Sequence, residues 1–202
     1  MTKRTKILII DGSYRDDGIT DQAVEEMSRA LTQLGADAET IMLRDHPIHF
    51  CLNCRECMQK PGPSPEPCVQ QDAMEMIVRK IEEADGYVLA APTNLGSITA
   101  IFKRFMERLA VYAYWPWGAH GPKFRKEKET RKKAVLITSS AAPGFLARWF
   151  YGTTGQLKYT AKIIGADPVG ILNSGLIAGH RDKTLPDSTL SKIRSYAEKL
   201  VI

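Results

Sequence analysis

The sequence predicts a doubly wound α/β domain with a five-stranded parallel sheet and helices on both faces. Strand and helix signals alternate from one end of the 202-residue chain to the other. The first strand signal, KILII, is a continuous apolar run, which is typical of a strand buried on both faces. No internal repeat or linker interrupts the alternation, and alternating strands and helices fold into a parallel sheet.

The strand signals come in five apolar runs. They cover residues 6–13, 38–43, 86–94, 132–144 and 167–175. Between them, apolar residues recur at helical spacing. The expected helices cover residues 20–34, 73–85, 100–114, 145–164 and 186–200. Several residues mark where these helices begin, end or break: Asp72 and either Ser97 or Thr99 as N-caps, Pro186 in a first turn, Gly35 as a stop, and Gly152 and Gly155 as a kink in the fourth helix.

We expect a single domain over residues 1–202 that carries two inserted segments. A Cys/Pro-rich insertion at 46–71 holds four prolines that deny it regular structure. An aromatic and basic loop covers 112–132. Its aromatic residues are either a lid on the protein's own core or an exposed patch that covers a ligand or another subunit. The basic run from Lys123 to Lys133 is either a solvated loop or an anion-attracting patch.

Composition limits the class of protein. Hydrophobic residues make up 44% of the chain, and no apolar stretch is long enough to span a membrane. The N-terminal apolar run is too short for a signal peptide, so we expect a cytoplasmic protein without a membrane partner. The net charge is +5, but no nucleic-acid-binding motif is present. Cytosolic thiols stay reduced, so clustered cysteines indicate metal or redox chemistry rather than disulfides.

The loop after the first strand, DGSYRDDGIT, has the features of a phosphate site. Ser13 and Thr20 offer hydroxyl groups, Arg15 offers a charged donor, and Gly18 permits a tight backbone. The loop leads into a helix N-terminus, where free N–H groups favour an anion. It lacks both the P-loop motif and the dinucleotide fingerprint, so a phosphate monoester is the expected ligand. The alternative is a polar turn that only connects strand to helix.

Two further loops suit a flat heterocycle. In APTNLGS, Pro92 fixes the backbone, Asn94 can bind a polar ring edge, Leu95 can lie along the ring, and Gly96 permits close approach. In TSSAAPG, small side chains leave room for a planar ring. Loops after parallel strands meet at the carboxyl edge of the sheet, and FMN is the simplest ligand that satisfies all three. Together the two loops contribute the ring-binding candidates Pro92, Thr93, Asn94, Leu95, Gly96, Ser139, Ser140, Ala141 and Gly144.

These motifs resemble the flavodoxin-like NADPH-dependent FMN reductase superfamily, and within it the iron–sulfur flavoprotein branch and its cluster-free relatives. The first loop matches G-S-x-R-x-x-G-x-T, with Ile19 at the usual Asn position, and a second motif matches between Pro92 and Arg108. The resemblance implies a flavodoxin-like fold with strand order 2-1-3-4-5. It also implies FMN as cofactor and NAD(P)H as electron donor.

All four cysteines lie in the inserted segment: Cys51, Cys54, Cys57 and Cys68. Two successive C-x-x-C steps let three thiolates converge, as in bacterial ferredoxins, and a fourth can return from further along the chain. The resemblance implies a [4Fe–4S] cluster in one branch. Redox thiols or structural remnants without a cluster, and a zinc site, stay open as alternatives, with His46 and His49 as substitute ligands.

The expected function is an FMN-dependent oxidoreductase similar to NAD(P)H-dependent flavin reductases. It passes electrons between a reduced nicotinamide or a one-electron carrier and an acceptor, in one alternative through the cluster. Two other classes stay open: a non-enzymatic electron carrier of flavodoxin type and a zinc-stabilised binding module without flavin. The aromatic segments favour a homodimer or homotetramer.

Overall fold

The computed structural model describes residues 4–143, 150–175 and 184–202. A parallel sheet of five strands forms its centre, in the order β2-β1-β3-β6-β7, which confirms the expected order. The strands are β1 (Lys6–Asp11), β2 (Asp37–Met42), β3 (Gly86–Ala90), β6 (Lys132–Ser139) and β7 (Ala166–Ser174).

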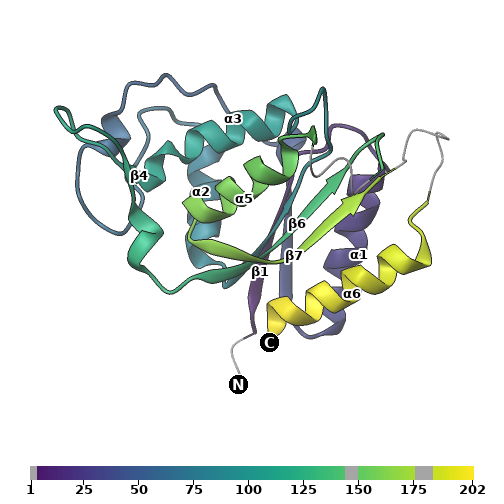
Figure 1. The fold of residues 1–202 in the computed structure, drawn as a ribbon. Coiled ribbons are helices and arrows are strands. Elements are labelled where there is room, and N and C mark those ends of the chain that lie inside the picture. The colour runs from purple at the N-terminus through teal and green to yellow at the C-terminus, as the bar shows by residue number, and fades with distance from the viewer. Residues whose placement is uncertain (1–3, 144–149, 176–183) are drawn as a thin grey trace.

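Helices cover both faces of the sheet (Figure 1). One face packs against α1 (Ile19–Gln33) and α6 (Asp187–Val201), and the other packs against α2 (Ala73–Glu83), α3 (Ala100–Arg108) and α5 (Thr153–Ile163). Successive strand side chains point to opposite faces, so Ile7 and Ile9 join the first core and Leu8 and Ile10 join the second. The sheet is therefore apolar on both sides, as a continuous apolar run predicts.

Several predicted helix ends are confirmed. Asp72 caps α2 by accepting a hydrogen bond from the Met74 N–H, and Thr99 caps α3 by accepting one from the Phe102 N–H. Gly35 follows α1 with a positive φ of 82°, where its lack of a side chain removes the steric penalty. None of the described helices combines the length and apolarity needed to cross a membrane.

Two helix predictions are wrong in part. The helix expected over 100–114 ends at Arg108, and a 3-10 turn, η3 (Leu109–Tyr112), follows it. This turn directs the buried Tyr112 toward Glu82, to which its hydroxyl donates at 3.0 Å. The expected break at Gly155 does not occur, since α5 is continuous there; it begins after Gly152. Residues 145–149 of that prediction lie outside the described residues.

The two inserted segments contain little regular structure. The cysteine arm, which we define as residues 46–71, has one 3-10 turn, η2 (Glu56–Met58), after another, η1 (Leu43–Asp45), at its entry. The loop over 112–132 contains a two-stranded antiparallel ladder and a 3-10 turn. These elements are β4 (Ala113–Tyr114), β5 (Lys123–Phe124) and η4 (Arg125–Lys128).

Candidate functional site

The three loops expected to bind one ligand are bonded together at the carboxyl edge of the sheet. The Gly12 N–H donates to the Ala90 carbonyl at 2.8 Å, which joins the first loop to β3. The Thr93 N–H donates to the Ser139 carbonyl at 2.8 Å, and the hydroxyls of Thr20 and Ser139 are hydrogen-bonded at 2.8 Å. Residues more than one hundred positions apart in sequence thus form one rim.

The first loop leaves the start of α1 open to an anion. Gly18 is the N-cap of α1, and as a glycine it has no side chain with which to cap the helix. The first-turn amides, which include those of Ile19 and Thr20, are the groups that such a helix end offers to a phosphate. Ser13 is buried, and its hydroxyl donates to the Arg15 carbonyl at 3.2 Å, while the Arg15 residue itself is exposed. The donor chemistry of this loop fits a phosphate monoester.

Gly12 keeps the first loop against α3. A Cβ atom at this position would lie 2.7 Å from the Cβ of Phe102, closer than folded proteins tolerate. Thr99 completes the contact, because its hydroxyl donates to the Gly12 carbonyl at 2.7 Å while it also caps α3. The sequence motif contained Gly12 and Thr99, but only the structure shows that they contact each other.

The second loop presents a tight turn with an exposed apolar tip. Backbone hydrogen bonds join Asn94 and Ser97 in both directions, at 2.8 and 3.1 Å. Leu95 and Gly96 adopt positive φ angles of 47° and 79°, and the Leu95 side chain is fully exposed. Gln156 of α5 accepts from the Ser97 hydroxyl at 2.9 Å, so a helix fixes the turn. Pro92 and Thr93 at its base are partly buried.

The third loop continues from β6. Ser139 and Ser140 are buried, and the Ser140 N–H donates to the Ser174 carbonyl at 2.9 Å. Ala141 is exposed beside them, while Gly144, the last candidate of this loop, lies outside the described residues. The small side chains therefore line the rim next to the second loop, as a planar ring would require.

Two buried carboxyl groups at the rim were not predicted as functional. Asp11 ends β1 with 0% of its surface exposed, and Asp21 in the first turn of α1 is 3% exposed. Burial raises the pKa of Asp11 to about 7, against a lowering by the hydrogen bond from the Ser13 N–H, and the charge of Asp21 raises it further. The only sequence signal was an aspartate directly after an apolar strand.

The four cysteines lie near one another without forming a ligand set. Cys57 is buried, and its pKa is raised to about 11, first by burial and then by the charges of Cys68, Cys51 and Cys54. Over the described residues, however, no group of three or more Cys, His, Asp or Glu side chains is placed to hold a metal ion. In this arrangement the four thiols do not form a ligand set, so we derive no reaction step through a cluster.

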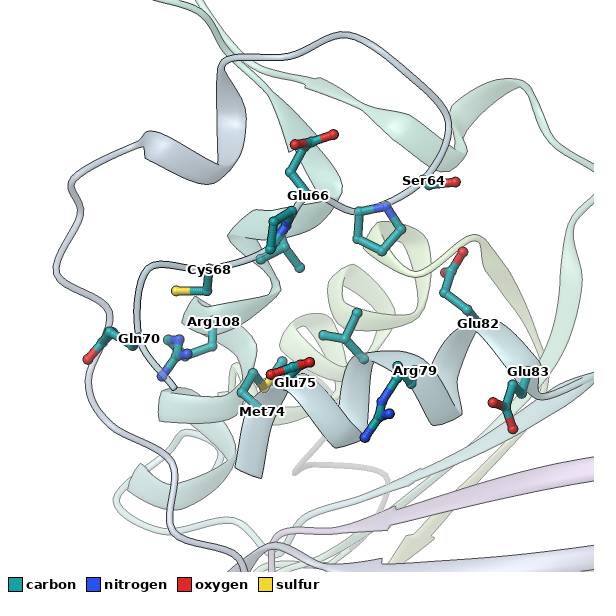
Figure 2. A pocket seen from close by; sticks show the side chains of 14 residues that line it. Ser64, Glu66, Cys68, Gln70, Met74, Glu75, Arg79, Glu82, Glu83 and Arg108 are labelled. Carbon is teal, nitrogen blue, oxygen red and sulfur yellow. The ribbon is translucent and has the colours of Figure 1, made fainter. Parts of the chain in front are cut away.

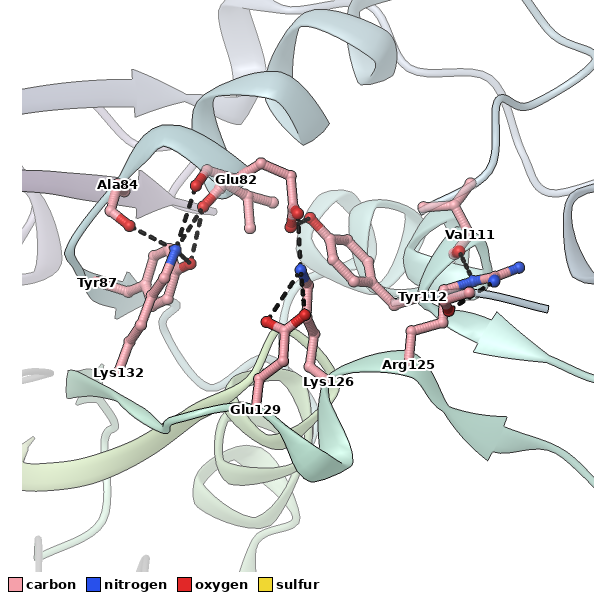
Figure 3. Close-up of polar contacts among 11 residues, drawn as sticks. Glu82, Ala84, Tyr87, Val111, Tyr112, Arg125, Lys126, Glu129 and Lys132 are labelled. Carbon is pink, nitrogen blue, oxygen red and sulfur yellow. Dashed lines mark hydrogen bonds and ion pairs between the residues drawn. The ribbon is translucent and has the colours of Figure 1, made fainter. Parts of the chain in front are cut away.

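A buried arginine fastens the cysteine arm to the rest of the molecule. Arg125 donates to the carbonyls of Cys57, Lys60 and Gly62 in the arm at 3.2, 2.9 and 3.1 Å, and to the Val111 carbonyl at 3.0 Å. Figure 3 shows the contact with Val111. The solvated-loop interpretation of the basic run is therefore wrong for Arg125, and equally for its buried neighbour Lys126.

Lys126 and Lys132 bind to the end of α2. Lys126 pairs with Glu82 at 2.7 Å, and Figure 3 shows this carboxylate between Lys126 and Tyr112. Lys132 donates to the Ala84 carbonyl at 2.5 Å and to the Tyr87 hydroxyl at 3.1 Å. Burial lowers the pKa of Lys132. These contacts give both lysines structural partners inside the protein.

The aromatic residues of the second insertion also hold the arm. The Arg55 guanidinium lies 3.8 Å from the ring centroid of Trp115 and 4.3 Å from that of Trp117. Arg55 also donates to the Trp115 carbonyl at 2.6 Å. Trp117 stays 63% exposed, so the aromatic residues are neither wholly a lid on the core nor wholly a free patch.

Arg108, the last residue of the second motif, ties α3 to the other end of the arm. Its guanidinium is nearly fully buried and binds both carboxylate oxygens of Asp72, at 2.6 and 3.2 Å, and the His49 carbonyl at 3.0 Å. Burial opposes the charge on Asp72, but hydrogen bonds from Arg108, His49 and Met74 outweigh it and lower the pKa of Asp72. The sequence places Arg108 only in the second motif and Asp72 only at a helix N-cap, so it does not predict this contact.

A cavity of about 490 Å³ lies between the cysteine arm and α2 (Figure 2). Pro65, Pro67 and Val78 contribute apolar walls, and Cys68 and Arg108 line one part of it. Its lining includes no residue of the three loops, so it is separate from the rim.

Comparison with known proteins identifies similar chains. Residues 5–148 match the model of a family described as NADPH-dependent FMN reductase. An iron–sulfur flavoprotein of Methanocaldococcus jannaschii is 32% identical over 103 residues, 51% of each chain. One from Archaeoglobus fulgidus is 30% identical over 111 residues, 55% of this chain and 48% of that protein. The chain thus spans about half the length of the curated relatives it matches.

Solved structures share the fold. An NAD(P)H:quinone oxidoreductase from Methanothermobacter marburgensis superimposes with a TM-score of 0.72 at 15% identity, over 98% of this chain and 100% of that one. An FMN-dependent NADH-azoreductase from Bacillus anthracis, solved with FMN, gives a TM-score of 0.66 at 15% identity, with coverage of 98% and 100%.

Proposed function

The chain belongs to the NADPH-dependent FMN reductase family, and we propose that it is an FMN-dependent oxidoreductase that draws electrons from NADH or NADPH. The observation that carries this proposal is the rim itself, where three loops are hydrogen-bonded around a helix N-terminus whose N-cap is a glycine. FMN, when bound, supplies the hydride and electron chemistry. The protein supplies position, charge and exclusion of water.

We assign the phosphate to the first loop and the ring to the other two. Ser13, Arg15 and the backbone from Gly18 through Ile19 to Thr20 would hold the phosphate at the start of α1. The ring would lie against Pro92–Gly96 and Ser139–Ala141, with exposed Leu95 along it. A general acid or base is not required of these residues for hydride transfer to flavin.

Flavin retention and NAD(P)H oxidation test this assignment. The protein is loaded with FMN, desalted and scanned for a flavin absorbance band, then assayed for NADH and NADPH oxidation with an added acceptor. We expect a retained band and turnover with at least one nicotinamide. Retained flavin without any turnover would favour the electron-carrier alternative, and failure to retain flavin would refute the proposal.

A variant localises the phosphate. Arg15→Ala removes a charged donor, which is worth about 1.5–3 kcal/mol to a bound anion, so FMN affinity should fall by at least about tenfold. Arg29→Ala, on the exposed side of α1, is the matched control and should bind FMN as the wild type does. Equal FMN affinity of the two variants would contradict the placement of the phosphate at this loop.

The role of the cysteines is a separate proposal. We propose that Cys51, Cys54, Cys57 and Cys68 hold a [4Fe–4S] cluster, supported by their spacing in the sequence and by the similarity of the chain to iron–sulfur flavoproteins. Cluster assembly would have to draw the thiols together. Iron, sulfide and zinc analysis after anaerobic purification tests this. We expect iron and sulfide in the wild type and their loss in Cys57→Ala. Zinc in place of iron would favour a structural metal site, and the absence of any metal would favour redox thiols.

We also propose a homodimer or homotetramer. Exposed apolar side chains occur on loops that follow the carboxyl ends of β1, β2 and β3, namely Tyr14, Phe50, Leu52 and Leu95. Apolar side chains gathered at one edge favour a protein contact. Light scattering during gel filtration should give at least twice the 22.5 kDa of one chain, and a monomer mass would refute it.

A further inference from the structure

We propose that Asp11 and Asp21 share one proton beneath the phosphate loop, so that FMN binding takes up a proton and weakens as pH rises. The inference rests on the proposed function, because it needs the FMN phosphate at residues 13–20. The pair takes no part in the chemistry of the flavin ring. Its effect is on the charge that the incoming phosphate meets.

The pair is buried and lacks donors. Oδ1 of Asp11 accepts from the Ser13 N–H at 2.7 Å, and Oδ2 of Asp21 accepts from Arg44 at 3.0 Å. The remaining oxygens, Asp11 Oδ2 and Asp21 Oδ1, are buried, and the described residues offer neither of them a donor. Ser13 and Arg44 link the two carboxyl groups, because Arg44 also donates to the Ser13 carbonyl at 3.3 Å. A proton on one of these oxygens removes a buried charge and supplies the donor that the pair lacks, whereas two ionised groups leave both oxygens unsatisfied.

Arg44 is the cation that the described residues bring to this pair. It follows β2, and it also binds Asp16 of the loop at 2.8 Å. From β3 and α3, the groups that contact this part of the loop are Ala90, Thr99 and Phe102, which carry no charge. Within the described part of the chain, the interactions found here thus set the Arg44 guanidinium against three carboxyl groups, two of which are buried.

Two buried carboxyl groups in contact do not both ionise at neutral pH, since each disfavours the charge of the other. The pKa of about 7 for Asp11, raised by burial before any other cause, agrees with this arrangement. Protonation of Asp11 removes one negative charge from the pair, and its ionisation as pH rises restores that charge. The second charge lies directly under the loop, at the helix end that a phosphate would share with Asp21.

A phosphate monoester brings close to two negative charges at neutral pH. It lowers the local potential and favours the protonated pair, so binding above pH 7 should draw a proton from solution. A bound cation is the other way to satisfy two carboxylates. Over the described residues no group of three or more metal-ligating side chains is present here, so the structure favours the proton.

Calorimetry measures the proton directly. The apoprotein is titrated with FMN at pH 8 in two buffers that differ in ionisation enthalpy, because the phosphate's own ionisation, with a pKa of about 6, is complete there. We expect uptake of up to one proton per FMN. The dissociation constant, followed by flavin fluorescence from pH 6 to 9, should rise above pH 7 by up to about tenfold per pH unit.

Variants assign the proton to the pair. Asp11→Asn should abolish proton uptake and flatten the pH dependence of the dissociation constant above pH 7. Asp17 is an exposed acid of the same loop, and Asp17→Asn should retain the proton uptake and the pH dependence. Riboflavin, which lacks the phosphate, should bind without uptake. Asp21→Asn is the second variant, with the same expectation, should Asp11→Asn not fold.

The outcomes are separable. If FMN binds the wild type at pH 8 without proton uptake, the inference alone is overturned. The same holds if the wild type and Asp11→Asn take up equal numbers of protons. FMN that does not bind at any pH would overturn the proposed function, and the inference with it.

Discussion

At the scale of single residues, Gly12 shows how closely the rim is packed. A methyl group there would meet Phe102 at 2.7 Å, so Gly12→Ala should force α3 away from β1. We expect a loss of about 1–3 kcal/mol in the free energy of unfolding, measured in urea, and weaker FMN binding.

A second glycine is the control for this change. Gly155 lies inside α5, and among the described residues a methyl group added there would meet nothing within 4 Å beyond the backbone of its own helix. Gly155→Ala should therefore stabilise the protein by up to about 1 kcal/mol. If the two alanine variants had equal stability, the contact between Gly12 and Phe102 would not constrain the loop.

Asp11 predicts how the stability of the apoprotein depends on pH. Its pKa is raised from 3.8 to about 7, so the folded state binds more protons than the unfolded state between these values. Stability should therefore fall as pH rises through this window, by up to about 4 kcal/mol from this group. Unfolding of the wild type and Asp11→Asn at pH 5 and pH 8 measures the part of this effect that lies above pH 5.

Asp11→Asn should remove most of the difference in unfolding free energy between pH 5 and pH 8. Asp72 acts in the opposite direction, because its pKa is lowered and its contribution is lost only as the solution becomes acidic. A wild-type protein that gains stability from pH 5 to pH 8 by the same amount as Asp11→Asn would contradict the account of Asp11.

At the scale of elements, the cysteine arm depends on Arg125. Arg125→Ala removes four hydrogen bonds from a buried guanidinium, three of them to the arm. We expect faster proteolysis within 57–62, an unchanged far-ultraviolet circular dichroism spectrum and a loss of roughly 3 kcal/mol. Lys123→Ala, at an exposed neighbouring position, should be cleaved by the protease at the wild-type rate. Equal cleavage of both variants would show that another contact holds the arm.

The strands were predictable from sequence because each is an apolar run whose neighbours along the chain are helices. Their order came from the resemblance. The end of α3 was not predictable, because Tyr112 leaves the helix to reach Glu82, thirty residues earlier in the chain. The contacts of the two insertions were missed for the same reason: Arg55 and Trp115 are sixty residues apart. Long-range contacts of this kind leave no periodic signal.

The candidate site was also predictable from sequence only in part. Loop positions after parallel strands follow from topology, so residues from Ser13 to Thr20 and from Pro92 to Gly96 could be grouped in advance. The hydroxyl pairing of Thr20 with Ser139 and the carboxyl pair of Asp11 and Asp21 depend on burial, which a single sequence does not reveal. The binding roles of these loops stay predictions.

At the scale of the whole molecule, the family match and the relatives confirm the resemblance to the FMN reductase superfamily and to its iron–sulfur flavoprotein branch. The sheet places the three loops that we propose to bind FMN at one edge, and the arm extends from the same edge after β2. Separate segments can therefore serve one cofactor without any linker between domains.

The central claim is that FMN binds at this edge, and a crystal structure of the protein with FMN tests it most directly. The account predicts the phosphate at the start of α1 against Ser13 and Thr20, with the ring between Leu95 and Ser139. Flavin in the cavity between the arm and α2, or a phosphate remote from α1, would contradict it.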